Sequence, residues 1–333
     1  MKYYNCLENP IKIYGLAVTE PGKFHRLPDD VINTVNDGVS GLAKHTAGAC
    51  VRFNTDSRTI EVKVKLIGGG LMGHMPLSGM SGVDVYFGDM FCGSIYPSIA
   101  DVTEYSGAVN KFVQAGNGMC TVTVNLPLYN GVKDVTIGIS DGTEIYEPTP
   151  YRVEKSMLFY GSSITQGGCA SRPGNAYPAL LSRWLDIAHI NLGFSGSARG
   201  EESIARYIGS LDLSTFVMDY DYNATSVEHL QATHYNFYKI IRELNPNLQI
   251  IFVTKPDIES NLVLSEQRRD IIYNTYAEAL KAEDKYVNFI DGAKLFGEKD
   301  RLSCTVDTYH PNDLGFFMMA EAMVGTLRNV LGV

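Results

Sequence analysis

The sequence predicts two folded regions of different class. Residues 1–150 are expected to form an all-β, jelly-roll-like sandwich, and residues 151–333 an α/β/α doubly wound domain. Three observations support this. Apolar residues alternate with polar ones in the first half, apolar runs alternate with helix-period stretches in the second, and the Pro-rich segment Glu147-Pro148-Thr149-Pro150 lies between them. A chain of 333 residues is long enough for two ordinary domains.

Period-two alternation predicts the strands of the first half, between Cys50 and Ile139. The apolar members of its runs are Ile60, Val62, Val64 and Leu66, then Val122, Val124 and Leu126, then Val135, Ile137 and Ile139. The dipeptides Asn117-Gly118, Asn130-Gly131 and Asp141-Gly142 tolerate positive φ and predict hairpin turns. With no convincing amphipathic helix here, an antiparallel sandwich is favoured over an open sheet, which would leave one face uncovered.

Five mostly apolar runs in the second half predict parallel strands covered on both faces: Met157–Tyr160, His189–Leu192, Phe216–Asp219, Ile250–Thr254 and Val287–Ile290. Helical patterns separate them; the clearest carries Leu230, His234, Phe237, Ile241 and Leu244 ahead of Pro246, and the last begins near Asn312. The prediction is a five-stranded parallel sheet of flavodoxin-like type. Its ligands should lie at the carboxyl ends of the strands.

Composition excludes several classes of partner. The net charge is −9 and neither half is basic, so nucleic acid is not an expected partner. No apolar run approaches the roughly 18–20 residues that cross a bilayer, so membrane insertion is not expected. The six cysteines occur singly, and the first residues lack the apolar stretch of a secretory leader. We therefore expect reduced thiols and a cytoplasmic protein.

A small-residue turn follows the first predicted parallel strand, at Gly161-Ser162-Ser163-Ile164-Thr165-Gln166-Gly167-Gly168. It is not a phosphate-binding P-loop, because that motif requires a Lys and a different glycine spacing. It also departs from the G-x-S-x-G nucleophile elbow, since position 165 is Thr. Taken alone, the turn is either an ordinary Gly/Ser turn or a loop that exposes a reactive hydroxyl.

The segment Asp307-Thr308-Tyr309-His310-Pro311 lies between the last predicted strand and the last helix. It should therefore meet Ser163 at the same edge of the sheet. A neutral imidazole can accept a proton from a hydroxyl when a carboxylate holds its other nitrogen in the correct tautomer. Asp307, three residues before His310, can supply that carboxylate.

With these residues in view, the chain resembles the GDSL-like SGNH hydrolase superfamily over residues 156–331. Four blocks carry the resemblance: Gly161–Thr165, Asn191–Gly196, Asp219–Asn223 and Asp307–Pro311. It implies a serine esterase with Ser163 as nucleophile, His310 as base and Asp307 as its orienting acid. It also implies an oxyanion hole formed by the N–H groups of Ser163 and Gly196 and the side-chain amide of Asn223. No cofactor and no metal are implied.

The chain departs from the family pattern at two places: Ser162 stands where family members commonly carry Asp, and Asp221-Tyr222 where they carry a glycine-rich approach to the Asn. The strings Phe24–Pro28 and Val51–Ser57 resemble a subgroup with an N-terminal β-sandwich, many of whose members are carbohydrate deacetylases. This resemblance implies a short acyl ester, acetyl above all, on a sugar or glycan. The candidate substrate contacts are Asp221, Tyr222, Tyr309 and, from the glycine-rich loop 68–82, His74.

Two alternatives stay open at this stage. The first is a glycan-binding protein with a degenerate hydrolase site, and the second is a lipid or thioester acyl hydrolase of the same superfamily. The oligomeric state does not follow from the sequence.

Overall fold

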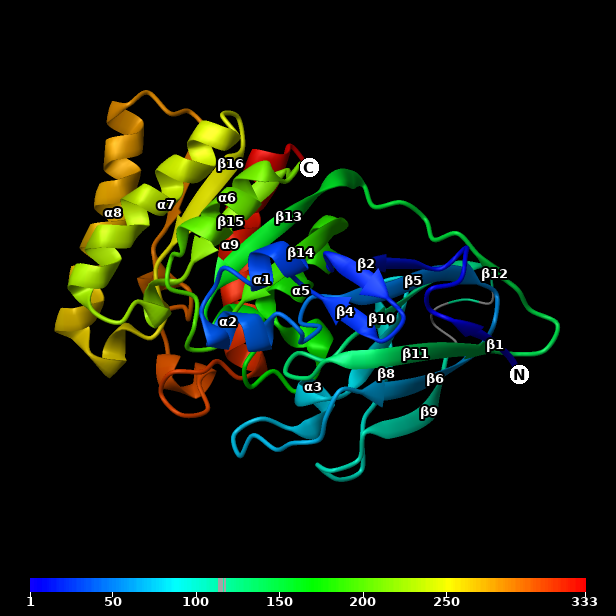
Figure 1. Cartoon of the computed structure of the whole chain (residues 1–333). Coiled ribbons are helices and arrows are strands. Elements are labelled where there is room, and N and C mark those ends of the chain that lie inside the picture. Colours follow the sequence, from blue (N-terminus) through cyan, green and yellow to red (C-terminus); the bar gives the residue numbers. More distant parts are fainter. Residues whose placement is uncertain (113–115, 117) are drawn as a thin grey trace.

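The computed structural model describes residues 1–112, 116 and 118–333. The first half of the chain folds as two antiparallel sheets packed face to face, and the second half as a parallel sheet between helices (Figure 1). Both predicted architectures are confirmed. The last sandwich strand ends at Tyr146 and the first parallel strand begins at Val153; the predicted boundary at residue 150 stays a prediction.

The sandwich has one sheet of four strands and one of six. The first has the order β1-β11-β6-β9, with β1 at Lys2–Asn5, β11 at Val132–Ile139, β6 at Thr59–Leu66 and β9 at Glu104–Asn110. The second has the order β12-β5-β10-β7-β8, with β12 at Ile145–Tyr146, β5 at Cys50–Thr55, β10 at Cys120–Asn125, β7 at Val83–Phe87 and β8 at Met90–Ile95. β2 (Lys12–Tyr14) also pairs with β5, and β3 (Val18–Glu20) and β4 (Lys23–His25) form a separate ribbon.

The alternation read from the sequence explains the sandwich core. In β6, Val62 and Val64 are buried while Lys63 and Lys65 are exposed. β11 pairs with β6 so that Val64 lies opposite Val135, and both face the apolar residues of the second sheet. Burial of one face of each sheet fixes the register, because a one-residue slip would bring the lysines into the core.

Two of the predicted hairpin turns are wrong. Asn130-Gly131 connects β10 to β11 and Asp141-Gly142 connects β11 to β12, and in both cases the two strands belong to different sheets. Gly142 has the positive φ of +82° that such a turn favours. Asp141-Gly142 forms the expected tight turn and Asn130-Gly131 does not, and neither dipeptide carries information on which strands pair. For the third dipeptide, Asn117 lies outside the described residues.

Three short helices in the first half had no counterpart in the prediction: α1 (Asp29–Ile32), α2 (Asp37–Leu42) and α3 (Leu77–Met80). Each is at most six residues long, too short to show a helical period. A side-chain cap marks α2, where the Asn36 side-chain oxygen Oδ1 accepts a hydrogen bond from the Val39 N–H at 3.1 Å.

The parallel sheet has the strand order β14-β13-β15-β16-β17, and all neighbours run parallel. The strands are β13 (Val153–Gly161), β14 (Ile187–Gly193), β15 (Thr215–Asp219), β16 (Gln249–Val253) and β17 (Val287–Ile290), which confirms the five predicted strands. β13 lies between β14 and β15, so the strand order reverses beside it. Ligands bind at such a switch point in doubly wound sheets.

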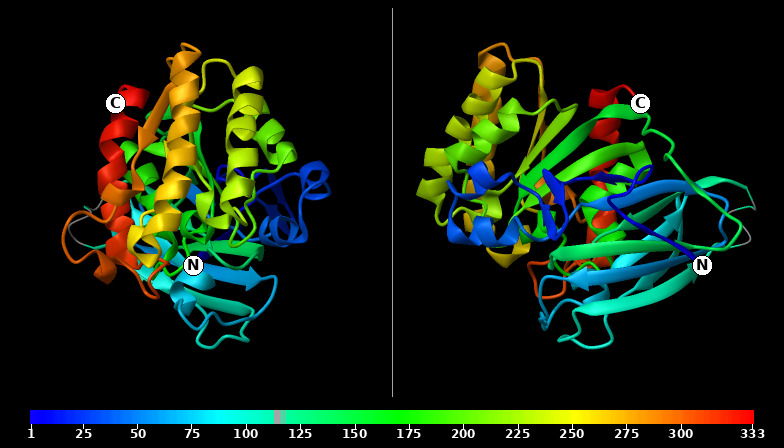
Figure 2. Two further views of the ribbon diagram at one scale, coloured as in Figure 1. Left: turned by 90° about the vertical axis from the view of Figure 1, so that its left-hand side faces the viewer. Right: turned by 45° about the vertical axis from the view of Figure 1, so that its right-hand side comes forward.

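Helices cover both faces of this sheet (Figure 2). Leu158 and Tyr160 of β13 point into the core beneath α6, α7 and α8, whereas Met157 and Phe159 point into the core beneath α5 and α9. The long helices are α5 (Tyr177–Leu185), α6 (Glu202–Ser210), α7 (Val227–Leu244), α8 (Leu262–Lys281) and α9 (Asp313–Leu331). Short helical turns are α4 (Ser163–Gln166), η2 (Pro173–Asn175), η3 (Asp221–Asn223), η4 (Ile258–Ser260), η5 (Gly292–Lys294) and η6 (Arg301–Cys304).

Among the described helices, α9 alone is long and apolar enough to cross a membrane by length and composition, with a mean hydropathy of 1.2. Its buried residues Phe316, Met319 and Met323 pack into the core that α5 also covers. Packing inside the α/β domain therefore explains why the buried face of α9 is apolar.

Candidate active site

Three polar side chains meet at the carboxyl edge of the sheet, as the sequence predicts. Ser163 begins α4 directly after β13, and Asp307 and His310 lie in the loop before α9. The Ser163 Oγ is 2.9 Å from His310 Nε2, and His310 Nδ1 is 2.8 Å from Asp307 Oδ2. Side chains 147 positions apart in the chain thus form one hydrogen-bonded series.

The loop before α9 holds the Asp307 carboxylate in place. Its Oδ1 accepts hydrogen bonds from the backbone N–H groups of His310, at 2.8 Å, and Tyr309, at 3.1 Å. Burial by itself would raise the pKa of Asp307, but these two bonds and the bond from the imidazole outweigh it and lower the pKa below its usual value. Thr308 has a φ of +71°, a strained conformation for a β-branched residue.

The turn that carries Ser163 is tightly packed. A Cβ on Gly161 would lie 2.4 Å from the backbone oxygen of Asp219, so this position at the end of β13 requires glycine. The Ser162 hydroxyl caps α4 by accepting the Ile164 N–H at 3.1 Å. Serine can therefore fill the capping role at this departure from the family pattern, since Ser and Asp are both good N-caps.

A buried polar layer beneath the turn was missed from the sequence. The Asp219 carboxylate accepts hydrogen bonds from the hydroxyls of Tyr177, at 2.9 Å, and Thr165, at 3.1 Å. Burial raises the pKa of Asp219 well above its usual value. The sequence did contain one indication of this buried layer, because Asp219 is an acidic residue at the end of a mostly apolar strand.

The sandwich also supports the turn. The Tyr129 hydroxyl donates to the backbone oxygen of Ser163 at 3.0 Å, and the Gln166 amide donates to the backbone oxygen of Leu128 at 3.0 Å. The oxygen of the same amide, Gln166 Oε1, accepts a hydrogen bond from the Ser195 N–H at 3.0 Å. Residues of the first half are therefore part of the site's scaffold.

The two further oxyanion candidates lie on neighbouring loops. Gly196 follows β14 and has a φ of +67°; a Cβ there would meet no protein atom within 4 Å. The structure therefore explains this glycine by its backbone conformation. Asn223 ends η3, and its Nδ2 donates to the backbone oxygen of Phe194 at 2.7 Å. This bond ties the Asn223 side chain to the loop that carries Gly196.

The four candidate substrate contacts lie in two places. His74 and Tyr309 lie beside His310, and Asp221 and Tyr222 lie in η3, the turn after β15. The His74 ring lies 5.3 Å from that of His310, and Tyr309 is exposed next to it. Tyr222 is half-buried, and its hydroxyl has no hydrogen-bond partner among the described residues. Asp221 is only 1% exposed, so it is not a solvated loop carboxylate. Burial raises its pKa to about 6.

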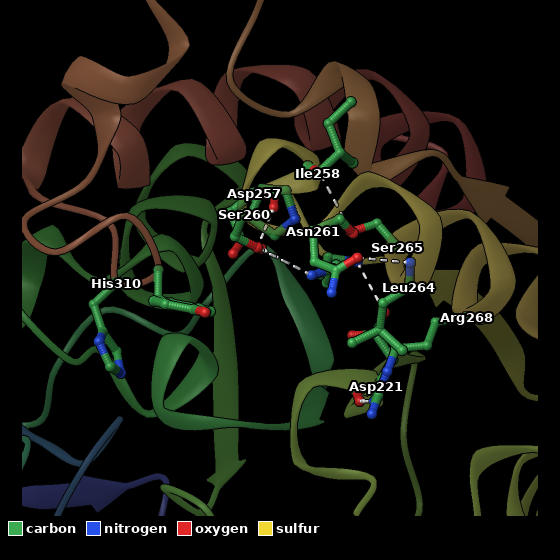
Figure 3. Close-up of polar contacts among 12 residues, drawn as sticks. Asp221, Asp257, Ile258, Ser260, Asn261, Leu264, Ser265, Arg268 and His310 are labelled. Carbon is green, nitrogen blue, oxygen red and sulfur yellow. Dashed lines mark hydrogen bonds and ion pairs between the residues drawn. The ribbon is translucent and has the colours of Figure 1, made fainter. Parts of the chain in front are cut away.

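Asp221 belongs to a polar cluster that the sequence did not indicate (Figure 3). Its Oδ2 accepts the Lys255 N–H at 3.2 Å, and its backbone oxygen accepts a hydrogen bond from Arg268. Asp257 is 2% exposed, and neither carboxylate oxygen has a hydrogen-bond partner among the described residues. The Lys255 Nζ is 3.7 Å from it. Burial raises the pKa of Asp257 to about 8.

Folding also creates a set of possible metal ligands that no sequence spacing indicated. One ligand atom each of His74, Cys169 and His310 lie within 4.8 Å of one another. Both ring nitrogens of His310 already take part in the hydrogen-bonded series with Ser163 and Asp307. A cation held by these three side chains would have to compete with that series.

A serine, a histidine and an aspartate hydrogen-bonded in this order at the switch point of a parallel sheet have the geometry of a serine hydrolase site. The chain belongs to the GDSL-like lipase/acylhydrolase family, whose model matches residues 154–328. A second model, described as the N-terminus of SGNH hydrolase-type esterases, matches residues 1–145. The protein is therefore a carboxylic ester hydrolase.

Solved structures share the whole two-part fold. A protein described as a GDSL-like lipase from Bacteroides ovatus is 27% identical, with a TM-score of 0.88 over 99% of this chain and 98% of its own. A family two carbohydrate esterase from Clostridium thermocellum, in complex with cellohexaose, is 14% identical, with a TM-score of 0.68 over 97% and 99%. An acetyl xylan esterase from Butyrivibrio proteoclasticus is 12% identical, with a TM-score of 0.63 over 99% and 98%. A comparison with curated protein sequences found no match.

Proposed function

We propose that the protein is a serine esterase that removes short acyl groups, acetyl above all, from carbohydrate esters. The observation that carries this proposal is the hydrogen-bonded series from Ser163 through His310 to Asp307, with distances of 2.9 and 2.8 Å. It presents a hydroxyl to a base whose other nitrogen is held by a carboxylate. This is the arrangement that acyl transfer to serine requires.

The proposed reaction has two stages. The Ser163 Oγ attacks the ester carbonyl while its proton passes to His310 Nε2, and the alcohol leaves with that proton. Water then attacks the acyl-enzyme, giving its proton to His310, and the carboxylic acid is released as the proton returns to Ser163. In both stages the N–H groups of Ser163 and Gly196 and the amide of Asn223 stabilise the charge on the carbonyl oxygen. One such donor is typically worth about 10²–10³ in rate.

A carbohydrate as the alcohol half is supported by two similar structures, the cellohexaose complex and the acetyl xylan esterase. Aromatic side chains next to the site fit this choice, because the exposed ring of Tyr309 offers an apolar face to a sugar ring.

The decisive experiment compares Ser163→Ala with the wild type on p-nitrophenyl acetate and on a panel of acetylated sugars. We expect the variant to lose several orders of magnitude in kcat while its thermal unfolding stays close to that of the wild type. Ser210→Ala is a matched control, because this exposed serine ends α6. Undiminished turnover by Ser163→Ala would refute the proposal.

A fluorophosphonate probe separates an esterase from a glycan-binding protein with an inactive site. We expect covalent labelling of the wild type and none of Ser163→Ala. A chain-length series of esters then tests the acyl group, with acetyl expected to be preferred over longer chains. A preference for long acyl chains or thioesters would instead support a lipid or thioester hydrolase.

A further inference from the structure

A second cavity lies between the two halves of the chain, apart from the Ser163 site. It has a volume of about 360 Å³. One wall consists of residues of β5 and β10, and the other of residues of α5 and the start of β14. None of the residues proposed for catalysis lines it. Its size is in the range of small-molecule sites, which is about 300–1,000 Å³.

The alternation of side chains along β5 places the charged side chain of Arg52 in the lining of this cavity. In β5, Val51 and Phe53 point into the sandwich core, so Arg52 between them points to the outer face, which the second half covers. Arg52 is only 7% exposed. Its guanidinium lies 3.7 Å from the centre of the Tyr151 ring, a cation–π contact.

The Arg52 charge lacks the partners that burial ordinarily demands. Its Nε and Nη1 have no hydrogen-bond partner among the described residues, and the buried carboxylate of Asp84 is paired with Arg172 instead. The two acidic residues of the lining, Asp89 and Asp186, are exposed. A buried charge without hydrogen bonds is costly, and an anionic ligand would supply the missing acceptors.

A second buried polar atom in the same lining is also unpaired. His189 Nε2 has no hydrogen-bond partner among the described residues, and burial lowers the pKa of His189 to about 4. The imidazole is therefore neutral at pH 7, and its unpaired Nε2 lies beside Gly48. The lining also holds the hydroxyl of Thr123 and those of Thr121 and Thr149, which both hydrogen-bond to Asn54. Hydroxyl groups of this kind suit a ligand that itself has several hydroxyls.

We propose that this cavity binds a hydroxylated carboxylate of monosaccharide size, with the carboxylate on Arg52. A planar guanidinium matches the two oxygens of a carboxylate, and charge-assisted hydrogen bonds of this kind are about twice as strong as neutral ones. The proposal does not depend on the reaction at Ser163.

The sequence offers a direct probe of the cavity. Trp184 is the only tryptophan in the chain, and it belongs to the lining. Its fluorescence is titrated with D-glucuronate, D-glucose and inorganic phosphate at constant ionic strength. We expect glucuronate to change the Trp184 emission saturably and with a Kd at least tenfold lower than glucose or phosphate.

Variants assign the binding to Arg52. Arg52→Gln should raise the Kd for glucuronate at least tenfold, while Arg206→Gln, at an exposed arginine of α6, should leave it unchanged. Circular dichroism and thermal unfolding establish that each variant is folded. If Arg52→Gln does not fold, Arg52→Lys and Thr123→Val serve instead, each with an expected rise in Kd of several-fold.

Several outcomes would overturn the proposal. Equal affinity for glucose would show that charge is not recognised, and equal affinity for phosphate would show a general anion site. Unchanged binding by folded Arg52 variants would remove the residue from the site. Titration of Ser163→Ala should give the wild-type Kd; a loss there would place the ligand at the active site instead.

Discussion

At the scale of single residues, Asp307 is the group through which the loop before α9 controls His310. Its carboxylate accepts from the imidazole and from two backbone N–H groups. An amide in its place could present an N–H to Nδ1 and stabilise the wrong tautomer. We expect Asp307→Asn to lower kcat for p-nitrophenyl acetate by about 10²–10⁴.

The control for this substitution is Asp212→Asn, at an exposed carboxylate that forms an ion pair with Lys155 on the surface. It should keep the wild-type kcat. A wild-type kcat in Asp307→Asn as well would mean that His310 is oriented without the carboxylate.

Asp257 should make the stability of the protein depend on pH. Because burial raises its pKa to about 8, the folded state binds this proton more tightly than the unfolded chain does. The associated stability is complete below pH 4 and is lost as the pH rises through about 8, with a slope of at most about 1.4 kcal/mol per pH unit. Asp257→Asn cannot ionise, so its stability should fall less between pH 5 and pH 9.

Urea unfolding at a series of pH values measures this difference. Asp221, Glu259 and Lys255 lie close to the Asp257 carboxylate, so the comparison is made between variant and wild type at each pH. Asp56→Asn, at an exposed carboxylate, is the control. Parallel curves for Asp257→Asn and the wild type would contradict the prediction.

At the scale of elements, the N-cap of α4 affects the site directly, because Ser163 is the first residue of this helix. Ser162 accepts the Ile164 N–H, and loss of such a cap typically costs about 1 kcal/mol. We expect Ser162→Ala to reduce the free energy of unfolding by about this amount. The esterase rate should also fall, because α4 begins at Ser163.

Ser226→Ala is the matched test for this element. Ser226 caps α7 in the same way, by accepting the His229 N–H at 3.1 Å. The two variants should lose similar stability, and only Ser162→Ala should lose activity. Equal rates in both variants would show that the cap does not position Ser163.

The five strands of the parallel sheet could be predicted because each is mostly apolar, and α7 could be predicted because its apolar residues recur at helical spacing. The pairing in the sandwich could not, since Asn130-Gly131 signals a turn whether the chain stays in one sheet or crosses to the other. The approach of Ser163 to His310 could be predicted, because loops that follow parallel strands meet at the same edge of the sheet. The burial of Asp221 and the approach of His74 depend on packing between segments distant in sequence, which no local pattern reports.

At the scale of the whole molecule, Arg26 connects the first half of the chain to the carboxyl end of β14. It is fully buried, and its guanidinium donates to the backbone oxygens of Asn191, at 2.9 Å, and Gly193, at 2.7 Å. It also donates to the backbone oxygens of Leu42 and His45. A lysine cannot reproduce this fork of donors.

We therefore expect both Arg26→Lys and Arg26→Met to lower stability by several kcal/mol, because each leaves buried backbone oxygens without donors. In the folded fraction kcat should also drop, since β14 leads into Gly196. Thermal unfolding and steady-state kinetics measure the two effects, with Arg206→Gln as the exposed control. Full activity and stability in Arg26→Lys would show that a single charge is sufficient.

The hydrogen bond from Tyr129 to the carbonyl of Ser163 has a consequence for any attempt to recombine this enzyme. We expect exchange of the sandwich alone to impair activity, because the segment around Leu128 and Tyr129 bonds to the turn that carries Ser163. Chimeras joined near residue 150 should work only when the donor sandwich brings a matching tyrosine to that carbonyl.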